Sequence, residues 1–284
     1  MTEPQRFETA GASALVWRDA PSWDGKWTAA VGGFACAGVA EGAALLEAIA
    51  AAMADEGYGA VVGPMDGDTW HRYRVVLDSD GAPPFLLEPV SGPHDRAAFE
   101  GAGFTPISQY VSARGALSEA LAASPAAVPG VTITPWDGRD ADRLVAQLFE
   151  LSLAEFSRNR FFAPIAREAF FGLYAPVLPL VDPAHVLFAH GPDGLVGFLF
   201  GIPDRLEGPQ PRTVILKTYA SRMRGVGHVL ADTFHRRALA LGFSHVIHAL
   251  MHVDNVSRDR SARHAARVFR RYALLGRELF PAGR

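Results

Sequence analysis

The chain is short of cysteine and lysine. Its 284 residues include one cysteine, Cys36, and two lysines, Lys26 and Lys217. A single cysteine excludes an intramolecular disulfide framework and a metal site built from several cysteines. The sequence also lacks a basic and apolar leader and an apolar run long enough to span a bilayer. We therefore expect a cytoplasmic protein that does not associate with a membrane.

An excess of positive charge is missing as well. The formal net charge is −3 at pH 7, so no basic field is available to hold nucleic acid, and we expect none as a partner. The 49% hydrophobic content is enough for a sizeable core. A chain of this length has room for two compact units.

The most informative segment lies in the second half of the chain. The apolar run Val214–Ala220 predicts a strand, and the turn Arg222-Met-Arg-Gly225-Val-Gly227 follows Ser221. Beyond the turn, apolar residues recur at helical spacing. The unpaired N–H groups at a helix start carry partial positive charge and can hold a phosphate. Glycines let the backbone approach such a group closely.

This combination resembles the pyrophosphate loop of the GNAT superfamily of acyl-CoA-dependent N-acyltransferases, whose signature is Gln/Arg-x-x-Gly-x-Gly/Ala. An ordinary tight turn between a strand and a helix is the alternative interpretation. The order of the predicted elements from residue 131 on also resembles that of the family. These elements are a strand at Val131–Thr134, a helix at Asp140–Phe156, a hairpin at Val186–Phe200, a strand at His245–Met251 and a helix at Ser261–Leu275.

The first half of the chain resembles the second. Sliding the sequence by 185 residues places Phe34–Gly42 on Tyr219–Gly227, and Gly57-Tyr58 on Gly242-Phe243. Chance similarity between Ala-rich segments is the alternative. The resemblance to the family then implies the GNAT fold twice, an α/β (α+β) arrangement with a mixed twisted sheet flanked by helices. Ser118–Gly130 has the composition of a linker.

We therefore predict two domains, a truncated and degenerate GNAT-like unit at 1–125 and a complete, active one at 126–284. Ala37 and Ala40 stand in the first half where the second has Arg222 and Gly225. A further alignment, at another offset, matches Phe99 with Tyr272. The first copy thus keeps the scaffold and loses the groups that would bind phosphate. Its segment Gly63–His71, which contains Trp70, is a candidate contributor to a cleft shared by both units.

The resemblance implies acetyl-CoA or CoA as co-substrate. In the family, the strand before the glycine turn pairs with pantetheine, and the turn holds the pyrophosphate. An Asn after the next strand commonly contacts the cofactor as well, although Asn255 is as consistent with capping a turn. The implied cofactor-binding residues are Leu216, Lys217, Thr218, Tyr219, Ala220, Arg222, Arg224, Gly225, Val226, Gly227, His228 and Asn255.

Two residues are candidates for proton transfer. The family often uses a Tyr on its last helix to protonate the departing thiolate, and Tyr272 matches that placement; a core tyrosine is the alternative. His252, near the end of its predicted strand, is the candidate base, whereas His248 is expected to be a core histidine. On a strand the two histidines would be ~13 Å apart. We therefore expect no metal site.

The acceptor is the least defined part of the prediction. Lys217 stands alone in an apolar strand, where burial is costly without a partner. It is a candidate for binding a substrate carboxylate, and a structural salt bridge is the alternative. Asn159 and Phe161 follow the helix where the family forms its acceptor pocket, although Phe161 is equally typical of a core.

Taken together, the residues and the resemblance predict an N-acyltransferase of the GNAT type, with a small-molecule or peptide amine as acceptor, either monomeric or a homodimer. The alternative is a catalytically inactive acyl-CoA-binding module or sensor. A third class, the aminoacyl-tRNA-dependent ligases of the Fem type, is disfavoured by the acidic charge balance.

Overall fold

The computed structural model describes residues 3–121, 125–176, 178, 181–254, 261 and 264–280. The first half contains β1 (Gln5–Thr9), β2 (Ala12–Trp17), β3 (Thr28–Cys36), α1 (Val39–Asp55), β4 (Ala60–Gly63), β5 (Val75–Ser79), α2 (Asp95–Gly101), β6 (Thr105–Ala116) and α3 (Leu117–Ala120). The second half contains β7 (Thr132–Pro135), α4 (Ala141–Phe156), α5 (Arg167–Tyr174), η2 (Pro183–His185), β8 (Val186–Gly191), β9 (Gly194–Pro203), η3 (Arg205–Glu207), β10 (Thr213–Ser221), α6 (Val226–Ala240), β11 (His245–His252) and β12 (Arg267–Glu278).

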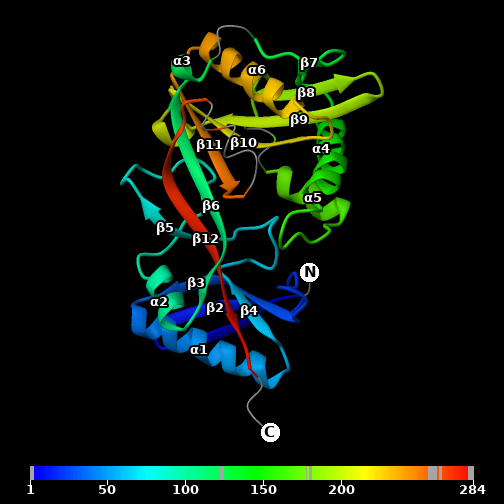
Figure 1. The fold of residues 1–284 in the computed structure, drawn as a ribbon. Helices are drawn as coiled ribbons and strands as arrows, with labels where there is room; N and C mark the ends of the chain where they lie inside the picture. Colours follow the sequence, from blue (N-terminus) through cyan, green and yellow to red (C-terminus); the bar gives the residue numbers. More distant parts are fainter. Residues whose placement is uncertain are drawn as a thin grey trace.

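All these strands form one mixed sheet in the order β1-β2-β3-β4-β12-β6-β11-β10-β9-β8-β7, with β5 attached to β12 (Figure 1). Helices cover both faces in the second half because side chains alternate along each strand. Phe198 and Phe200 of β9 pack under α4 and α5, whereas Leu199 between them packs under α6. The predicted mixed sheet flanked by helices is confirmed.

Most of the predicted elements of the second half are present. The predicted hairpin is β8 and β9, and the strand, helix and strand around the glycine turn are β10, α6 and β11. Helix α4 begins at the predicted place, and the Asp140 side chain caps it by accepting a hydrogen bond from the Arg143 backbone N–H at 3.0 Å.

The internal similarity is visible in the parallel strand pairs. Thr28 lies opposite Ala60 in β3 and β4, and Thr213 lies opposite His245 in β10 and β11. Both pairs therefore keep the same register 185 residues apart along the sequence. A single helix joins each pair, α1 or α6, and each helix is followed by a glycine in the left-handed region.

The predicted helix at Ser261–Leu275 is wrong, because the structure has strand β12 there from residue 267 on. The spacing of Val268, Tyr272 and Leu275 fits a helical stripe, but the whole run from 272 to 275 is buried. A continuous apolar run is as typical of a strand at the centre of a sheet as of a helix. The alignment of Tyr272 with Phe99 is wrong too, since Phe99 lies on helix α2.

The two halves exchange their last strands. Strand β6, the last of the first half, pairs with β11, and β12, the last of the second half, pairs with β4 and β5. The two long strands also pair with each other, from Arg114 opposite Arg267 to Thr105 opposite Gly276 (Figure 1). The sheet thus continues without a break across both halves, and the boundary at 125/126 stays a prediction.

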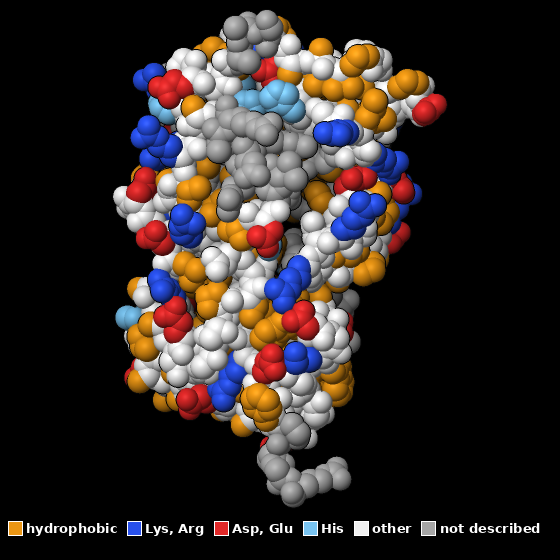
Figure 2. Space-filling model, viewed as in Figure 1, with side chains coloured by type: hydrophobic (Ala, Val, Ile, Leu, Met, Phe, Trp, Pro, Cys, Tyr) orange, Lys and Arg blue, Asp and Glu red, His pale blue; other side chains and the backbone are white. Residues whose placement is uncertain are grey.

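The predicted linker at Ser118–Gly130 begins inside helix α3 and then follows an irregular path over residues 125–130. The backbone N–H of Ala126 donates to Asp232 Oδ2 of α6 at 3.0 Å, which attaches this segment to the second half. None of the helices in the described ranges is long and apolar enough to cross a bilayer. On the face shown in Figure 2, Lys and Arg side chains are interspersed with Asp and Glu.

Candidate functional site

Strands β10 and β11 separate part-way along their length. They pair in parallel from Thr213 and His245 to Leu216 and His248. Both strands, which the structure describes in full, then continue to Ser221 and His252 without pairing further with each other. The register of β10 against β9 shifts between Leu216 and Thr218, so Lys217 is the extra residue of a bulge. Separated strands leave backbone N–H and C=O groups available to a ligand.

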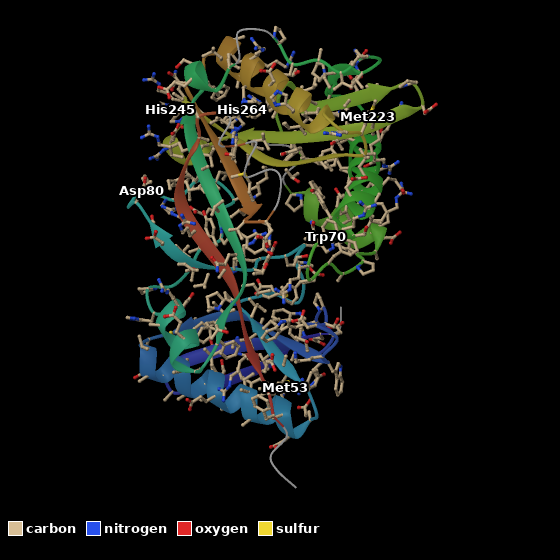
Figure 3. The ribbon with its side chains drawn as sticks, in the orientation of Figure 1. Met53, Trp70, Asp80, Met223, His245 and His264 are labelled. Atoms are coloured by element: carbon tan, nitrogen blue, oxygen red, sulfur yellow. The ribbon has the colours of Figure 1, made fainter. Side chains whose placement is uncertain are left out.

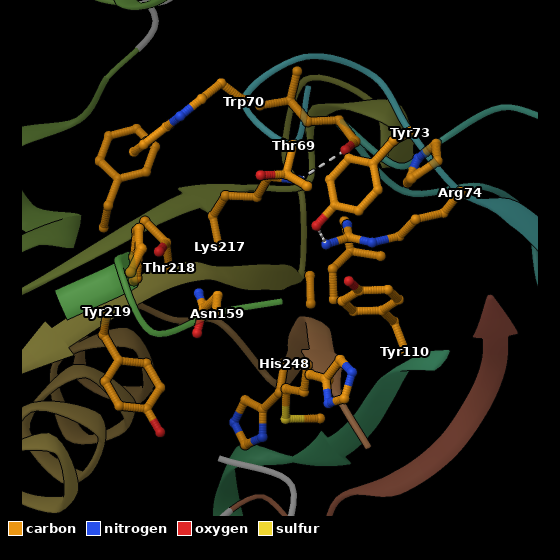
Figure 4. Close-up of a pocket in the computed structure, with 18 of the residues that line it drawn as sticks. Thr69, Trp70, Tyr73, Arg74, Tyr110, Asn159, Lys217, Thr218, Tyr219 and His248 are labelled. Carbon is orange, nitrogen blue, oxygen red and sulfur yellow. Dashed lines mark hydrogen bonds between the residues drawn. The ribbon is translucent and has the colours of Figure 1, made fainter. Parts of the chain in front are cut away.

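A cavity of about 1070 Å³ lies beside this gap. Its walls come from residues 66–74 and Tyr110 of the first half, from the segment after α4, and from the facing edges of β10 and β11 (Figure 4). Trp70, labelled in Figure 3, attaches the two halves at this place, since its Nε1–H donates to the Ala163 carbonyl at 2.8 Å. The cavity is therefore built jointly by both halves, and its size suits a small ligand.

Four of the five residues predicted to hold pantetheine line this cavity. Leu216, Lys217, Thr218 and Tyr219 do so, whereas Ala220 packs into the core under α4. Asn255, the candidate cofactor contact that follows β11 in the sequence, lies outside the described residues.

The glycine turn has the geometry that the sequence predicts. Gly225 has φ of 88° and is the N-cap of α6, whose described first turn contains no acidic residue and receives no side-chain cap. Its equivalent in the first half, α1, has Glu41 in the first turn. The exposed Arg222 has its Nε 3.8 Å from Glu155 Oε1. Residues 224–228 thus form a helix N-terminus suited to a phosphate, and binding there stays a prediction.

Tyr272 does not lie where its predicted role requires. It sits on β12, fully buried, and its hydroxyl bonds to Glu88 and, at 3.1 Å, to Ser112 Oγ. Burial raises the pKa of this phenol above its ordinary value, and Glu88 adds to the effect. The residues lining the cavity do not include Tyr272. The structure therefore gives the alternative interpretation, a core tyrosine, the better support.

His252 does line the cavity. Its Nδ1 accepts from the backbone N–H of Asp254 at 3.2 Å, so its Nε2 carries the proton and donates to Ser108 Oγ at 3.1 Å. Ser108 Oγ donates in turn to Tyr110 Oη at 2.9 Å. Burial, helped by the nearby Arg74, lowers the pKa of His252 below its ordinary value. The imidazole is therefore neutral at neutral pH.

His248, expected in the core, is buried and hydrogen bonded. Its Nε2 lies 2.9 Å from His235 Nε2, and its Nδ1 lies 2.6 Å from Ser261 Oγ. Burial lowers the pKa of His248 to about 3. Within the described residues, no three His, Cys, Asp or Glu side chains are arranged to hold a metal ion.

Of the two candidate acceptor contacts after α4, one reaches the cavity. Asn159 lines it, whereas Phe161 is 5% exposed and packs in the first-half core with Trp17 and Trp23. Phe161 is therefore a core residue, and its neighbour Phe162 lines the cavity instead. Sequence spacing could not separate the two, because they lie in an irregular segment where side chains follow no period.

Lys217 projects from the bulge and is half-buried. Its Nζ donates to the Leu87 carbonyl at 2.8 Å. Burial lowers the pKa of Lys217 to about 8, and the positive charge of Arg74 acts in the same direction.

Two polar residues of the cavity wall, Arg74 and Tyr110 of the first half, were not expected from the sequence. Trp70 and His71, the candidates for a shared cleft, do line the cavity, and His71 bonds through Nδ1 to Asp68 Oδ1 at 2.7 Å. That hydrogen bond raises the pKa of His71. For Arg74, the only available signal was its place shortly after this polar and aromatic segment.

No family model and no curated protein matches the sequence. Solved structures do match. A GCN5-related N-acetyltransferase from Sphaerobacter thermophilus is 16% identical with a TM-score of 0.54, over 94% of this chain and 76% of that one. A tandem GNAT protein of the clavulanic acid biosynthesis pathway, solved without AcCoA, is 15% identical with a TM-score of 0.55, over 96% and 80%. A probable N-acyltransferase from Enterococcus faecalis V583 is 11% identical with a TM-score of 0.55, over 94% and 59%.

Proposed function

Because the fold of the chain is similar to that of a GCN5-related N-acetyltransferase and of a tandem GNAT protein, we propose that it transfers an acyl group, most simply acetyl, from coenzyme A to an amine. The observation that best supports this is the separation of β10 and β11 at the Lys217 bulge, together with an α6 N-terminus that has no side-chain cap. Such a gap offers backbone groups to an extended amide-containing arm, and the helix start offers N–H groups to a phosphate.

The pyrophosphate of acyl-CoA would lie against Arg224–His228, and the arm would enter the gap beside Thr218 and Tyr219. Arg222 can turn from Glu155 to the phosphates at little cost, because an exposed ion pair contributes at most about 1 kcal/mol. The thioester then reaches the cavity, where Asn159 and the residues of the first half would hold the amine.

In the transfer, the amine nitrogen attacks the thioester carbonyl carbon and the C–S bond breaks. The amine loses a proton and the thiolate gains one. A backbone N–H of β10 beyond the bulge would stabilise the oxyanion. We assign the proton supply to Tyr110, in place of Tyr272. The phenol of Tyr110 lines the cavity and can be reprotonated along the hydrogen bonds from His252 through Ser108.

The first half would bind no second acyl-CoA. The carboxylate of Glu41 stands in the first turn of α1, where it opposes a phosphate. Exposed Ala40 occupies the position that corresponds to Gly225. We therefore expect a stoichiometry of one acyl-CoA per chain, with the first half acting as the wall of the acceptor cavity.

Calorimetry with acetyl-CoA tests the proposal. We expect one site per chain and at least a tenfold weaker affinity in Gly225→Ala, whose Cβ would meet Val128 Cγ2 at 3.1 Å. Gly242→Ala is the matched control. Gly242 has a similar φ of 92°, but it lies away from the site, and no heavy atom other than those of its chain neighbours lies within 4 Å of where its Cβ would stand. Equal affinities of the two variants, or two sites per chain, would contradict the proposal.

The alternative function is an inactive acyl-CoA-binding module. It is favoured by the lack of a carboxylate in Val214–Thr218, where many family members place a base. Both functions predict binding, but only the enzyme releases free CoA in the presence of an amine. Screening amine and peptide panels for CoA release separates them.

A further inference from the structure

Arg74 is an unusual residue in the cavity wall. Its guanidinium lies between the rings of Tyr73 and Tyr110, with Cζ at 3.7 Å and 3.9 Å from the two centroids (Figure 4). One terminal nitrogen donates to the Tyr73 hydroxyl. The Nε atom is buried and has no hydrogen-bond partner among the described residues. The rings fix the plane of the guanidinium.

The backbone of Arg74 is strained. Its φ of 87° lies in the left-handed region, which costs a residue with a Cβ about 1 kcal/mol or more. The strain lies directly before β5, which begins at Val75, and the Arg74 backbone N–H donates to the Pro64 carbonyl at 3.0 Å. Strained residues of this kind cluster at active sites and ligand-binding positions.

Two of the cations that line the cavity, Arg74 and Lys217, differ from Arg72 and Arg160, which have carboxylate partners. Within the part of the chain that the structure describes, neither Arg74 nor Lys217 forms an ion pair with a carboxylate. Glu88 lines the same cavity, but its carboxylate is occupied by Arg270 and Tyr272. A buried cation without a counter-ion is costly, and two near one another are more so.

We propose that the acceptor carries a carboxylate and that this group binds between Arg74 of the first half and Lys217 of the second half. The inference rests on the proposed function and names the class of its acceptor, an amino carboxylic acid or a peptide with a free carboxylate. The planar guanidinium can bind both oxygens of the carboxylate, and the lysine adds a second cation.

A carboxylate on the acyl group would have the same chemistry as one on the acceptor. The position of Arg74 favours the acceptor. Arg74 comes from the first half, and Figure 4 shows it on the opposite side of the site from Tyr219, beside which the arm of acyl-CoA would enter. The acyl group is short if it is acetyl and would end near the bulge.

The test compares each amino acid of an acceptor panel with its own carboxamide. We expect wild-type kcat/KM, or affinity for the CoA-saturated protein where no turnover is found, to favour the carboxylate by about 10- to 100-fold. The lower amine pKa of the carboxamide works against this preference. Arg74→Gln should remove the preference and leave acetyl-CoA affinity unchanged. Arg72→Gln is the control, since Arg72 lines the same cavity but is exposed beside Asp66.

The outcomes distinguish a failure of the proposed function from a failure of the carboxylate site. If acetyl-CoA does not bind, the proposed function fails, and the preference for a carboxylate is still measured by thermal shift on the free protein. Equal binding of acids and carboxamides overturns the inference while acyl-CoA binding stands. If Arg74→Gln weakens the binding of succinyl-CoA and leaves the binding of acetyl-CoA unchanged, the site belongs to the acyl group. That result would overturn the inference as well. Arg74→Lys is the folding control: it keeps the positive charge, so a variant that fails to fold here as well would show that the position is structural.

Discussion

Two tyrosines on neighbouring strands have opposite surroundings. Tyr110 of β6 lies directly opposite Tyr272 of β12. Tyr110 lines the cavity and is hydrogen bonded towards His252, whereas Tyr272 is enclosed with Glu88 and Ser112. The pair therefore allows the same chemical change, loss of one hydroxyl, to be made inside and outside the proposed reaction site.

Tyr110→Phe should lower kcat by roughly 10²- to 10⁴-fold with little change in acyl-CoA affinity, the usual contribution of a positioned acid. Tyr272→Phe should keep the rate but reduce the free energy of unfolding by about 1–2 kcal/mol, because buried Glu88 and Ser112 lose a partner. Free-CoA release and urea unfolding measure the two effects. The reverse pattern would restore Tyr272 as the acid.

The pKa of Lys217 leads to a pH dependence. With the pKa lowered to about 8, the cation is present below that pH and is lost above it. Affinity for an acidic ligand should therefore fall as the pH rises through about 8. The N-acetylated product suits this calorimetric titration, because it has no titratable amine. Lys217→Met should bind weakly at every pH; a wild-type affinity that does not change across this range would contradict the role of Lys217.

At the scale of elements, β12 is attached to the segment between β5 and α2 by a buried ion pair. Arg270 is 6% exposed, and its guanidinium binds Glu88 and the Ala82 carbonyl. Burying two charges is costly, and the pair does not by itself imply net stability. Removing one partner leaves the other charge buried, which is the more costly state.

Glu88→Gln should therefore reduce the free energy of unfolding by about 3–5 kcal/mol. Glu100→Gln is the matched control, because its partner Arg96 lies one helical turn away on the exposed surface of α2. The control should cost less than about 1 kcal/mol. Equal losses in urea unfolding would show that Arg270 finds another partner when Glu88 is neutral.

For the whole molecule, the exchange of last strands decides how the chain can be divided. A fragment of residues 126–284 would lose β6, which lies between β11 and β12, and the edges of both strands would be exposed. We expect the fragment to be poorly soluble or to melt without cooperativity. Co-expression with residues 1–125 should restore a complex with the melting temperature of the intact chain. A fragment that alone melts like the intact chain would contradict the shared core.

The sequence by itself determined the local units. The run from Val214 to Ala240 predicted β10, the glycine turn and α6, because strand propensity, left-handed glycine and helical spacing act between residues close in the chain. The repeat of 185 residues likewise predicted that α1 and its strands match α6 and its own. Of the cavity wall in the first half, only the segment ending at Trp70 and His71 was predicted, and the proton donor was not predictable in this way.

Only the tertiary structure decided which residues meet at the site. Tyr272 fits a helix or a strand equally well in sequence, and pairing with β6 and β5, remote in the chain, made it a buried strand residue. Arg74 faces Lys217 across the cavity only because the halves share one sheet. Local patterns specify local conformation, whereas contacts between distant segments depend on how strands pair, and the sequence carries no period that reports this pairing.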